Sequence, residues 1–523
     1  MRTTKRWNRK PGLAACVLVG VLTVGAQAAW ASPARNAARS GTLTMAALQA
    51  PVSLNPLLNG NNPDELYYND LAYEPLIYLA PNGSYQPGLA TSWHYNNNLT
   101  AFDIQLRRGA RFSDGTPLTA QAVVKSIEAV KTADGPIDIY ANVIKSVVAT
   151  GPLSVQLDLT GPDPDVALIM TQRMPVGDIV SPRALGNKSS FSDLANQTDG
   201  AGPYVLDRSA TIPGDTYTYV PNRYYYDQAG IHFGKVVIKV ISDSSTALNA
   251  LRTGQIAFAD GSFQSAPEAK ADGLSVYSAL STWFGGFLYD RNNGPLSSLK
   301  VRQALNYATN RPAITGTIFG GFGKPSDEVS LPGYKGDGYA PSCNNYYPYN
   351  LAKAKHLLAE AGYANGFTLT MGASSAWNDG AQIAQALASD WSAIGVKVNI
   401  KAYPTLVQMI GPWKSAQLPS LAGGYDGQPM YIEQGQLLAQ DAGLFNPYKT
   451  ADPALTSLIG KAMSATTKAS AAQDWTSVEC EVVKLAWFVP TSNGSRVYFA
   501  QKSLHGIGVS SVSFAPDPAT WYE

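Results

Sequence analysis

Ser297 and Lys300 have the S-x-x-K spacing of the serine-acylating tetrad of penicillin-binding proteins. That chemistry also needs S-D-N and K-T-G triplets, and neither occurs in the chain. The chain also lacks a P-loop, an H-E-x-x-H zinc motif, a G-x-S-x-G elbow and a Rossmann glycine fingerprint. Because a tetrapeptide with two free positions often arises by chance, we predict that the protein is not an enzyme.

Histidine and cysteine do not have the spacing of a metal site, so we predict neither a metal nor another cofactor. The histidines are scattered: His94, His232, His356 and His505. Apart from Cys16 near the N-terminus, the cysteines are Cys343 and Cys480. An even number of cysteines in an exported chain permits one disulfide, which would bring two distant segments side by side. The alternative is a pair of buried thiols.

Aromatic residues are plentiful, with 28 tyrosines and 10 tryptophans, and they supply large rigid contact surfaces. One group lies in the strand-like segment 282–290, where alternation sends Trp283 and Phe287 to one face and Phe284 to the other. The pair Gly285–Gly286 would let a ligand or a facing lobe approach the backbone closely. The alternative for this segment is a buried hinge strand.

The N-terminus predicts a signal peptide over residues 1–31. Basic residues between Arg2 and Lys10 precede an apolar core, Gly12–Val24, and an Ala-x-Ala cleavage site at residues 29–31. The core is shorter than the roughly 20 apolar residues of a membrane anchor. We expect residues 32–40 to be a disordered lead-in.

A lipobox at Leu13–Cys16 is the alternative, and it would attach a lipid to Cys16. Apolar residues follow this cysteine rather than precede it, which is the reverse of a lipobox. An exported protein without a lipid anchor would diffuse away from a single-membrane bacterium. We therefore favour an extracytoplasmic protein of the periplasm over a lipoprotein or a protein tethered by an uncleaved signal.

Charge and length limit the partners and the architecture. Lys plus Arg (39) nearly balance Asp plus Glu (38), and no basic run remains in the mature chain. These features exclude nucleic-acid binding from our expectations. A mature length of about 490 residues exceeds the usual size of one domain, so we expect at least two lobes.

The segment 102–120 predicts a strand, a turn and a helix. Phe102, Ile104 and Leu106 alternate with polar residues, Asp114–Pro117 is a turn, and Thr119 can cap the following helix. The block from Leu106 to Ala120 resembles the signature of the extracytoplasmic solute-binding proteins of peptide and nickel ABC importers, called family 5.

Further segments resemble motifs of this family, in the family's order. They are 41–45, 53–56, 73–76, 86–93, 200–204, 221–225, 250–256, 301–308 and 351–363. Three positions depart from the pattern: Tyr225 stands where the family has Trp, Ala257 where it has an acid, and Asn310 where it has Asp. Most of these residues serve packing and turns rather than ligand binding.

The resemblance implies an α/β, two-lobed periplasmic-binding-protein fold of the cluster C type, with the ligand cleft between the lobes. We expect the first lobe at 41–70, 197–285 and 491–523, with an extra subdomain at 71–196. We expect the second lobe at 286–490. A cleft between lobes is a favoured ligand site, because closure buries the ligand and moves a hinge.

The function implied by the resemblance is the substrate-binding component of an ABC importer. Such a protein captures a small solute, closes around it and delivers it to a membrane permease, acting as a monomer. We expect a short peptide first, because main-chain recognition tolerates varied side chains. An oligosaccharide, an opine-like conjugate and chelated nickel are alternative ligands, and a surface receptor or chaperone is an alternative function.

Peptide-binding relatives hold the peptide's ammonium group with an aspartate in a second-lobe loop. The corresponding segment here is 423–429, in which Asp426 is the one acid. Asp426 lies three residues before Pro429 where relatives have four, so spacing puts Tyr425 at the acid's position. We expect ligand contact from both, with a solvated turn aspartate as the alternative. Further candidates, with packing as their alternative, are Trp283, Tyr289, Trp377, Asn378, Trp413 and Tyr67.

Overall fold

The computed structural model describes residues 41–59, 63–133, 135, 137–186, 195–334, 336–374, 379–513 and 515–523. The predicted signal peptide (1–31), lead-in (32–40) and lipid attachment at Cys16 lie outside the described residues, as do Trp377 and Asn378.

Eleven strands of the described chain form one mixed sheet. Its order is β15 (Val396–Ala402), β14 (Phe367–Ala373), β16 (Ser420–Asp426), β12 (Ser275–Leu288), β17 (Phe488–Ala500), β11 (Phe258–Gly261), β1 (Thr42–Ala47), β10 (Lys235–Val240), β9 (Thr216–Pro221) and β8 (Tyr204–Leu206). β13 (Gly323–Pro325) pairs with β17 off this path. Parallel pairs such as β1–β10 and β14–β15 stand beside antiparallel ones, so the predicted α/β class is confirmed.

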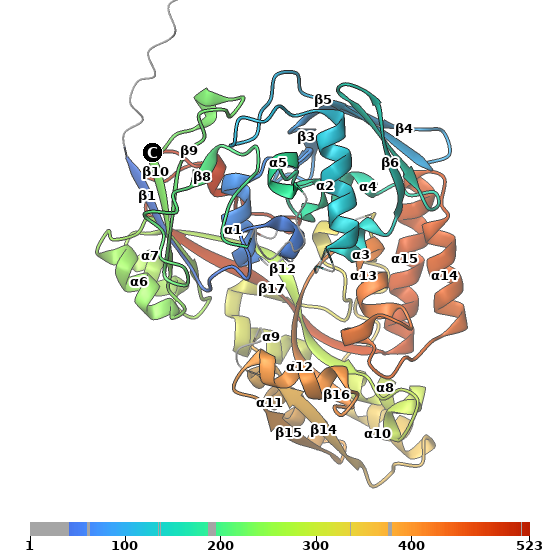
Figure 1. Cartoon of the computed structure of the whole chain (residues 1–523). Helices are drawn as coiled ribbons and strands as arrows, with labels where there is room; N and C mark the ends of the chain where they lie inside the picture. The colour runs from blue at the N-terminus through green and yellow to red at the C-terminus, as the bar shows by residue number, and fades with distance from the viewer. Residues whose placement is uncertain are drawn as a thin grey trace, which may run out of the picture. The chain divides into compact units, whose positions relative to one another are not determined.

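β12 and β17 are the long strands at the centre of this sheet, with 14 and 13 residues. They lie side by side and pair antiparallel from Ser275↔Ala500 to Phe287↔Phe488 (Figure 1). The end of β17 also pairs with β11, while the end of β12 also pairs with β16. The two strands therefore carry the sheet from one lobe into the other. The expected lobe boundaries at residues 285 and 490 fall inside them.

Helices cover both ends of the sheet (Figure 1). The α-helices of the first half are α1 (Pro63–Ala72), α2 (Ala120–Thr132), α3 (Asp138–Ala141), α4 (Val166–Ile169), α5 (Pro182–Leu185), α6 (Ser244–Arg252) and α7 (Ala266–Ala271). Those of the second half are α8 (Leu299–Tyr307), α9 (Arg311–Phe319), α10 (Leu351–Glu360), α11 (Gly380–Ser392), α12 (Leu406–Lys414), α13 (Met430–Glu433), α14 (Pro453–Met463) and α15 (Lys468–Leu485). Among the helices described, none has the length and apolar character that a membrane crossing requires.

Short helical turns connect the larger elements. They are η1 (Pro56–Leu58), η2 (Pro175–Gly177), η4 (Gln228–Gly230), η5 (Pro295–Ser297), η6 (Gly320–Phe322), η7 (Pro332–Tyr334), η8 (Gln434–Leu438), η9 (Gly443–Phe445) and η10 (Pro518–Thr520). Three apolar clusters make up the core. One is built largely by α8 to α11 with β14, and another by α6, α7 and the end of β17.

A separate four-stranded antiparallel sheet lies within residues 90–159. Its order is β4 (Ala90–Tyr95), β5 (Ala101–Leu106), β7 (Ser154–Leu159) and β6 (Ile144–Gly151), and a two-stranded ribbon of β2 (Ile77–Leu79) and β3 (Tyr85–Pro87) precedes it. Phe102, Ile104 and Leu106 are buried, as their alternation predicts. The Thr119 hydroxyl accepts a hydrogen bond from the Ala122 backbone N–H at 3.2 Å, which confirms the predicted helix cap.

Cys343 and Cys480 form a disulfide, which confirms the predicted pairing. Their Cα atoms lie 5.4 Å apart, within the usual range for a bridge. The bond ties α15 to the loop after Ala340 and closes a sequence separation of 137 residues. A cross-link over so long a loop mainly restricts the unfolded chain.

We predict that Cys343→Ser/Cys480→Ser loses about 2–5 kcal/mol of unfolding free energy, because the unfolded chain regains its loop entropy. Urea unfolding of the oxidised wild type and of the variant measures this loss. Dithiothreitol should lower the stability of the wild type and leave the variant unchanged. Equal midpoints for the wild type and the variant would contradict the expectation.

Candidate ligand-binding site

Arg496 is the one charged residue of the central strand β17. Its Nη2 lies 3.4 Å from Oδ2 of Asp426, the last residue of β16. The hydroxyl of Thr282, the register partner of Asp426 on β12, donates to Asp426 Oδ1 at 2.7 Å. Both charged side chains are about a fifth exposed, at 22% and 23%. The ion pair and the Thr282 hydrogen bond together join three strands of the central sheet.

Two further carboxylates act on Arg496 from other segments, Asp64 from α1 and Asp260 from β11. The hydroxyl of Tyr67, one helical turn after Asp64, lies 3.2 Å from each carboxylate oxygen of Asp260 and donates to it. Gln49 Nε2 donates to Asp64 at 3.1 Å. We call Arg496, Asp426, Asp64 and Asp260 the Arg496 cluster.

Acidic groups outnumber the single basic group in the Arg496 cluster. Burial, with the charge of Asp64, raises the pKa of Asp260 to about 7, and burial also raises the pKa of Asp64. Burial opposes the charge of Arg496, but Asp426 and the other acids outweigh it, so the pKa of Arg496 lies above its ordinary value. A guanidinium that stays charged beside three acids leaves room for a second cationic group.

A second polar set lies across the same strands. Tyr425, Trp283 and Asn493 are register neighbours on β16, β12 and β17, so their side chains share one face of the sheet. Trp283 Nε1, Asn493 Oδ1 and Gln428 Oε1 are buried without a hydrogen-bond partner in the described chain. Buried polar groups are nearly always satisfied, so these atoms are candidates for hydrogen bonds to a ligand. We call these four residues the Trp283 row.

The backbone between the two sets is irregular. The register between β12 and β17 shifts at Leu280/Thr282 and again at Phe284/Gly285, on either side of Thr282 and Trp283. A Cβ on Gly285 would lie 2.2 Å from the Val489 carbonyl oxygen, so glycine is required for this approach. Bulges re-aim side chains, and here they set the directions of the residues that carry both polar sets.

The aromatic candidates of the crossing strand are packed in the interior. Trp283 is fully buried, with its ring centroid 4.7 Å from that of Phe287, while Phe284 turns to Phe319 at 4.5 Å. This arrangement confirms the alternation predicted from the sequence. Tyr425 is 7% exposed; Gln428 Nε2 donates to its hydroxyl at 3.1 Å, and the hydroxyl also bonds to Gln436.

The other candidates occupy two places. Tyr289 and Trp413 are buried and stack on each other, with ring centroids 6.2 Å apart. Tyr67 belongs with the Arg496 cluster through its bond to Asp260. The structure thus brings Asp426 and Tyr67 to one polar cluster and Tyr425 and Trp283 to one row. Ligand contact from each remains a prediction.

Contacts across the chain hold the segment after β16 against residues 140–173. A guanidinium nitrogen of Arg173, which is 2% exposed, donates to the Gly427 carbonyl oxygen at 2.8 Å. The Tyr431 hydroxyl donates to buried Asp163, and Gln436 Nε2 donates to the Tyr140 hydroxyl. These bonds fix the backbone on which Tyr425 and Asp426 stand.

Sequence reasoning missed several residues of this site. Asp64 and Asp260 are ordinary acids in the sequence, and only tertiary contacts bring them to Arg496. A signal for Arg496 was present, since a lone charge inside an otherwise uncharged long strand requires a buried partner. The S-x-x-K residues take separate partners: Ser297 donates to the Gly294 carbonyl oxygen at 2.7 Å, and Lys300 pairs with Glu360 at 3.3 Å.

We predict that Asp260→Asn flattens the pH dependence of stability between about pH 4 and 7. A folded pKa of about 7, raised from 3.8, stabilises the folded protein below the unfolded pKa. That stabilisation is lost as pH rises through about 7, at about 1.4 kcal/mol per unit of pKa shift. Unfolding free energies of wild type and variant at four pH values across this window measure the difference. Parallel curves would contradict the expectation.

We also predict that Tyr431→Phe lowers the unfolding free energy by about 1–3 kcal/mol, because buried Asp163 loses a hydroxyl donor. Tyr349→Phe is the matched control, since Tyr349 is 46% exposed. The control should stay within about 0.5 kcal/mol of the wild type. Urea unfolding compares the three proteins, and equal losses in both variants would contradict the assignment.

Residues 84–432 match the family described as bacterial extracellular solute-binding proteins, family 5 middle. The glutathione-binding protein GsiB of Salmonella choleraesuis (strain SC-B67) is 29% identical over 336 residues, which are 63% of this chain and 63% of that protein. The alignment therefore spans less than two thirds of this curated relative.

Solved structures share the fold. The binding protein AgaA from A.tumefacien R10, in complex with agropinic acid, has a TM-score of 0.78 at 23% identity, over 92% of this chain and 97% of that one. DppA from Helicobacter pylori, in complex with the peptide STSA, has a TM-score of 0.77 at 21% identity, over 92% and 98% of the two chains. These likenesses confirm the periplasmic-binding-protein fold. With the family match covering most of the chain, the protein belongs to the family 5 bacterial extracellular solute-binding proteins.

Proposed function

We propose that this protein is the binding component of an ABC importer and captures a solute with a primary ammonium group, a short peptide first. The observation that carries the proposal is the surplus of carboxylates around Arg496. Asp426, Asp64 and Asp260 act on one guanidinium, so an ammonium group would offset part of the acidic excess. The bond to Asp426 would be charge-assisted in a partly buried place, where such bonds are strong.

The Trp283 row would hold the main chain of the ligand. A peptide unit offers one N–H donor and one C=O acceptor, and the row offers the Trp283 indole N–H with the amide oxygens of Asn493 and Gln428. Recognition through main-chain groups leaves the ligand's side chains free to vary. This pairing favours a peptide over an oligosaccharide, which offers hydroxyl groups and no ammonium.

Relatives with this fold bind different small solutes. They include a glutathione-binding protein and proteins in complex with the peptide STSA and with agropinic acid. A ligand of the opine kind is the second candidate. Its carboxylate groups would contact Arg496 in place of Asp426, because guanidinium matches carboxylate in a two-bond fork. The two candidates therefore depend on opposite members of one ion pair.

The remaining parts of the proposal follow from family membership and the N-terminus. The protein closes its lobes around the solute and presents the closed form to a membrane permease, without chemistry on the ligand. It works outside the cytoplasm, in the periplasm, as a monomer. We propose the lobes expected from the sequence, whose boundaries at residues 285 and 490 would fall within β12 and β17.

Native mass spectrometry of protein purified gently from its source would identify the retained ligand. A thermal-shift series with Ala-Ala and N-acetyl-Ala-Ala then tests the ammonium contact, because a ligand that binds only the folded state raises Tm. We predict that Asp426→Asn weakens Ala-Ala binding about 10- to 100-fold, the loss expected for one charge-assisted hydrogen bond. The variant should leave the weak binding of the acetylated peptide unchanged.

Asp441→Asn is the charge-matched control, since Asp441 is exposed. It should bind Ala-Ala as the wild type does. A retained ligand with the mass of a sugar or an opine would contradict a peptide ligand. A Kd for Ala-Ala that Asp426→Asn does not change would contradict it too. Either result would leave the family assignment intact. Loss of binding in Arg496→Gln with no effect of Asp426→Asn would favour the carboxylate ligand.

A further inference from the structure

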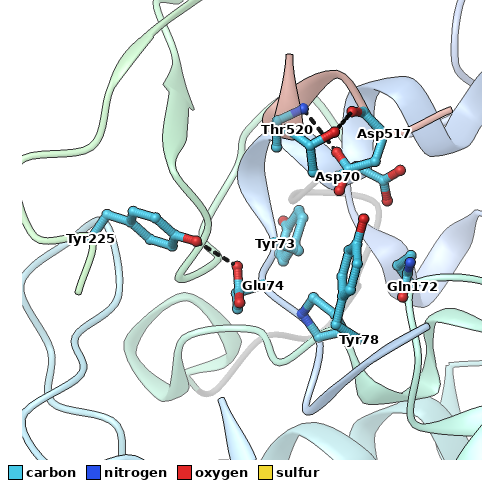
Figure 2. A pocket seen from close by; sticks show the side chains of 10 residues that line it. Asp70, Tyr73, Glu74, Tyr78, Gln172, Tyr225, Asp517 and Thr520 are labelled. Carbon is cyan, nitrogen blue, oxygen red and sulfur yellow. Dashed lines mark hydrogen bonds between the residues drawn. The ribbon is translucent and has the colours of Figure 1, made fainter. Parts of the chain in front are cut away.

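A polar cavity lies at the C-terminal end of α1. It measures about 140 Å³ and is lined by acids from three segments, Asp70, Glu74 and Asp517, together with Tyr73, Tyr78 and Tyr225. Figure 2 shows Asp70, Asp517 and Thr520 together on one side, with Glu74 and the tyrosines around the rest. Thr520 is exposed, so the cavity reaches the surface.

The residues that line this cavity include three carboxyl groups and no basic side chain. Asp70 is 6% exposed, and its Oδ1 has no hydrogen-bond partner in the described chain. Asp178, which is 1% exposed and lacks described partners for both oxygens, is close enough for its charge to act on Asp70. The charges that act on Asp70 and Asp178 are those of other carboxyl groups. The negative end of the α1 dipole adds to this field.

Hydroxyl groups donate hydrogen bonds to two of the three carboxyl groups that line the cavity, Glu74 and Asp517. Tyr225 and Tyr226 donate to Glu74 at 2.9 and 2.6 Å, and Tyr78 donates to Asp517. Arg107 also acts on Glu74, but its guanidinium lies over the Tyr226 ring, 4.1 Å from the centroid. None of these contacts involves Oδ1 of Asp70, the oxygen without a described partner. An ammonium group would supply the missing hydrogen bond and, once the acid is ionised, the opposite charge.

The lining indicates which cation would fit. No group of three or more His, Cys, Asp or Glu in the described residues is placed to hold a metal ion. Aromatic faces beside carboxylates instead suit an alkylammonium ion, which combines hydrogen bonds with cation–π contact. The volume is close to the roughly 150 Å³ of engineered cavities that accept benzene, so a small organic amine fits.

We propose that this cavity is a binding site for a small primary amine in its ammonium form, held by Asp70, Asp517 and Glu74 within the tyrosine rings. The site is separate from the Arg496 cluster. Asp64 of that cluster and Asp70 lie on one helix, six residues or about 9 Å apart along its axis. The proposal therefore does not depend on which ligand the Arg496 cluster binds.

Protons compete with the cation for this site. Burial raises the pKa of Asp517 to about 7, and burial with the charge of Asp517 raises that of Asp70 far above its usual range. A cation binds the ionised carboxylates and so displaces protons. A primary amine keeps its charge up to about pH 10. Its affinity should therefore rise as pH rises through about 7.

The experiment is a thermal-shift titration of the full mature protein with methylammonium chloride, against sodium chloride of equal ionic strength, at pH 6.0 and 8.5. We expect methylammonium to raise Tm beyond sodium, with a several-fold lower apparent Kd at pH 8.5. Asp70→Asn should lose this difference, because the amide matches the protonated acid in shape and carries no charge. Asp441→Asn, an exposed acid, should keep it.

Two further experiments distinguish this site from the Arg496 cluster. Asp426→Asn should keep the methylammonium shift, and Asp70→Asn should keep the binding of Ala-Ala. A shift equal to that of sodium, or one unchanged by Asp70→Asn, would overturn the proposal. A response to calcium chloride that exceeds the response to methylammonium would overturn the ammonium assignment. Loss of the shift in Asp426→Asn alone would place the amine in the cleft and overturn the second site.

Discussion

The pairing of β12 with β17 is the constraint on which the rest of this structure depends. The sheet has no other continuous path through the described chain from β14–β16 to β1 and β8–β11. Both polar sets of the candidate site are built on it: Arg496 and Asn493 stand on β17, and Thr282 and Trp283 on β12. A change in the angle between the lobes must therefore act on the residues proposed to hold the ligand, so ligand contact and closure are physically coupled.

Electrostatics explains why the site is built with an excess of acids. Burying ionised groups costs free energy, and a buried ion pair is weak support for stability. The Arg496 cluster holds three acids beside one guanidinium rather than a single pair. Burial raises the pKa of two of them, Asp64 and Asp260. Natural chains keep such costly groups at functional sites and stabilise the fold elsewhere. The disulfide between Cys343 and Cys480 and the three apolar clusters supply that stability here.

The parts predicted from sequence are those that local chemistry decides. The cap at Thr119, the alternation around Trp283 and the Cys343–Cys480 bridge each follow from short segments or from residue counts, and the structure has all three. The Arg496 cluster could not be found this way, because its acids come from α1, β11 and β16, well over 100 residues apart at each step. Residue type alone does not distinguish Asp260 from a surface acid.

The two acidic sites at either end of α1 differ in one respect that sets what each can bind. The Arg496 cluster contains a guanidinium, so it can meet an ammonium group through its carboxylates and a carboxylate through Arg496. A molecule with both charges, such as a short peptide, suits it. The cavity around Asp70 is lined by acids and tyrosines without a basic residue. A ligand carboxylate placed there would face like charge in a low dielectric, which costs several kcal/mol. The proposed amine site would therefore favour cations over zwitterions, although the same helix supplies both sites.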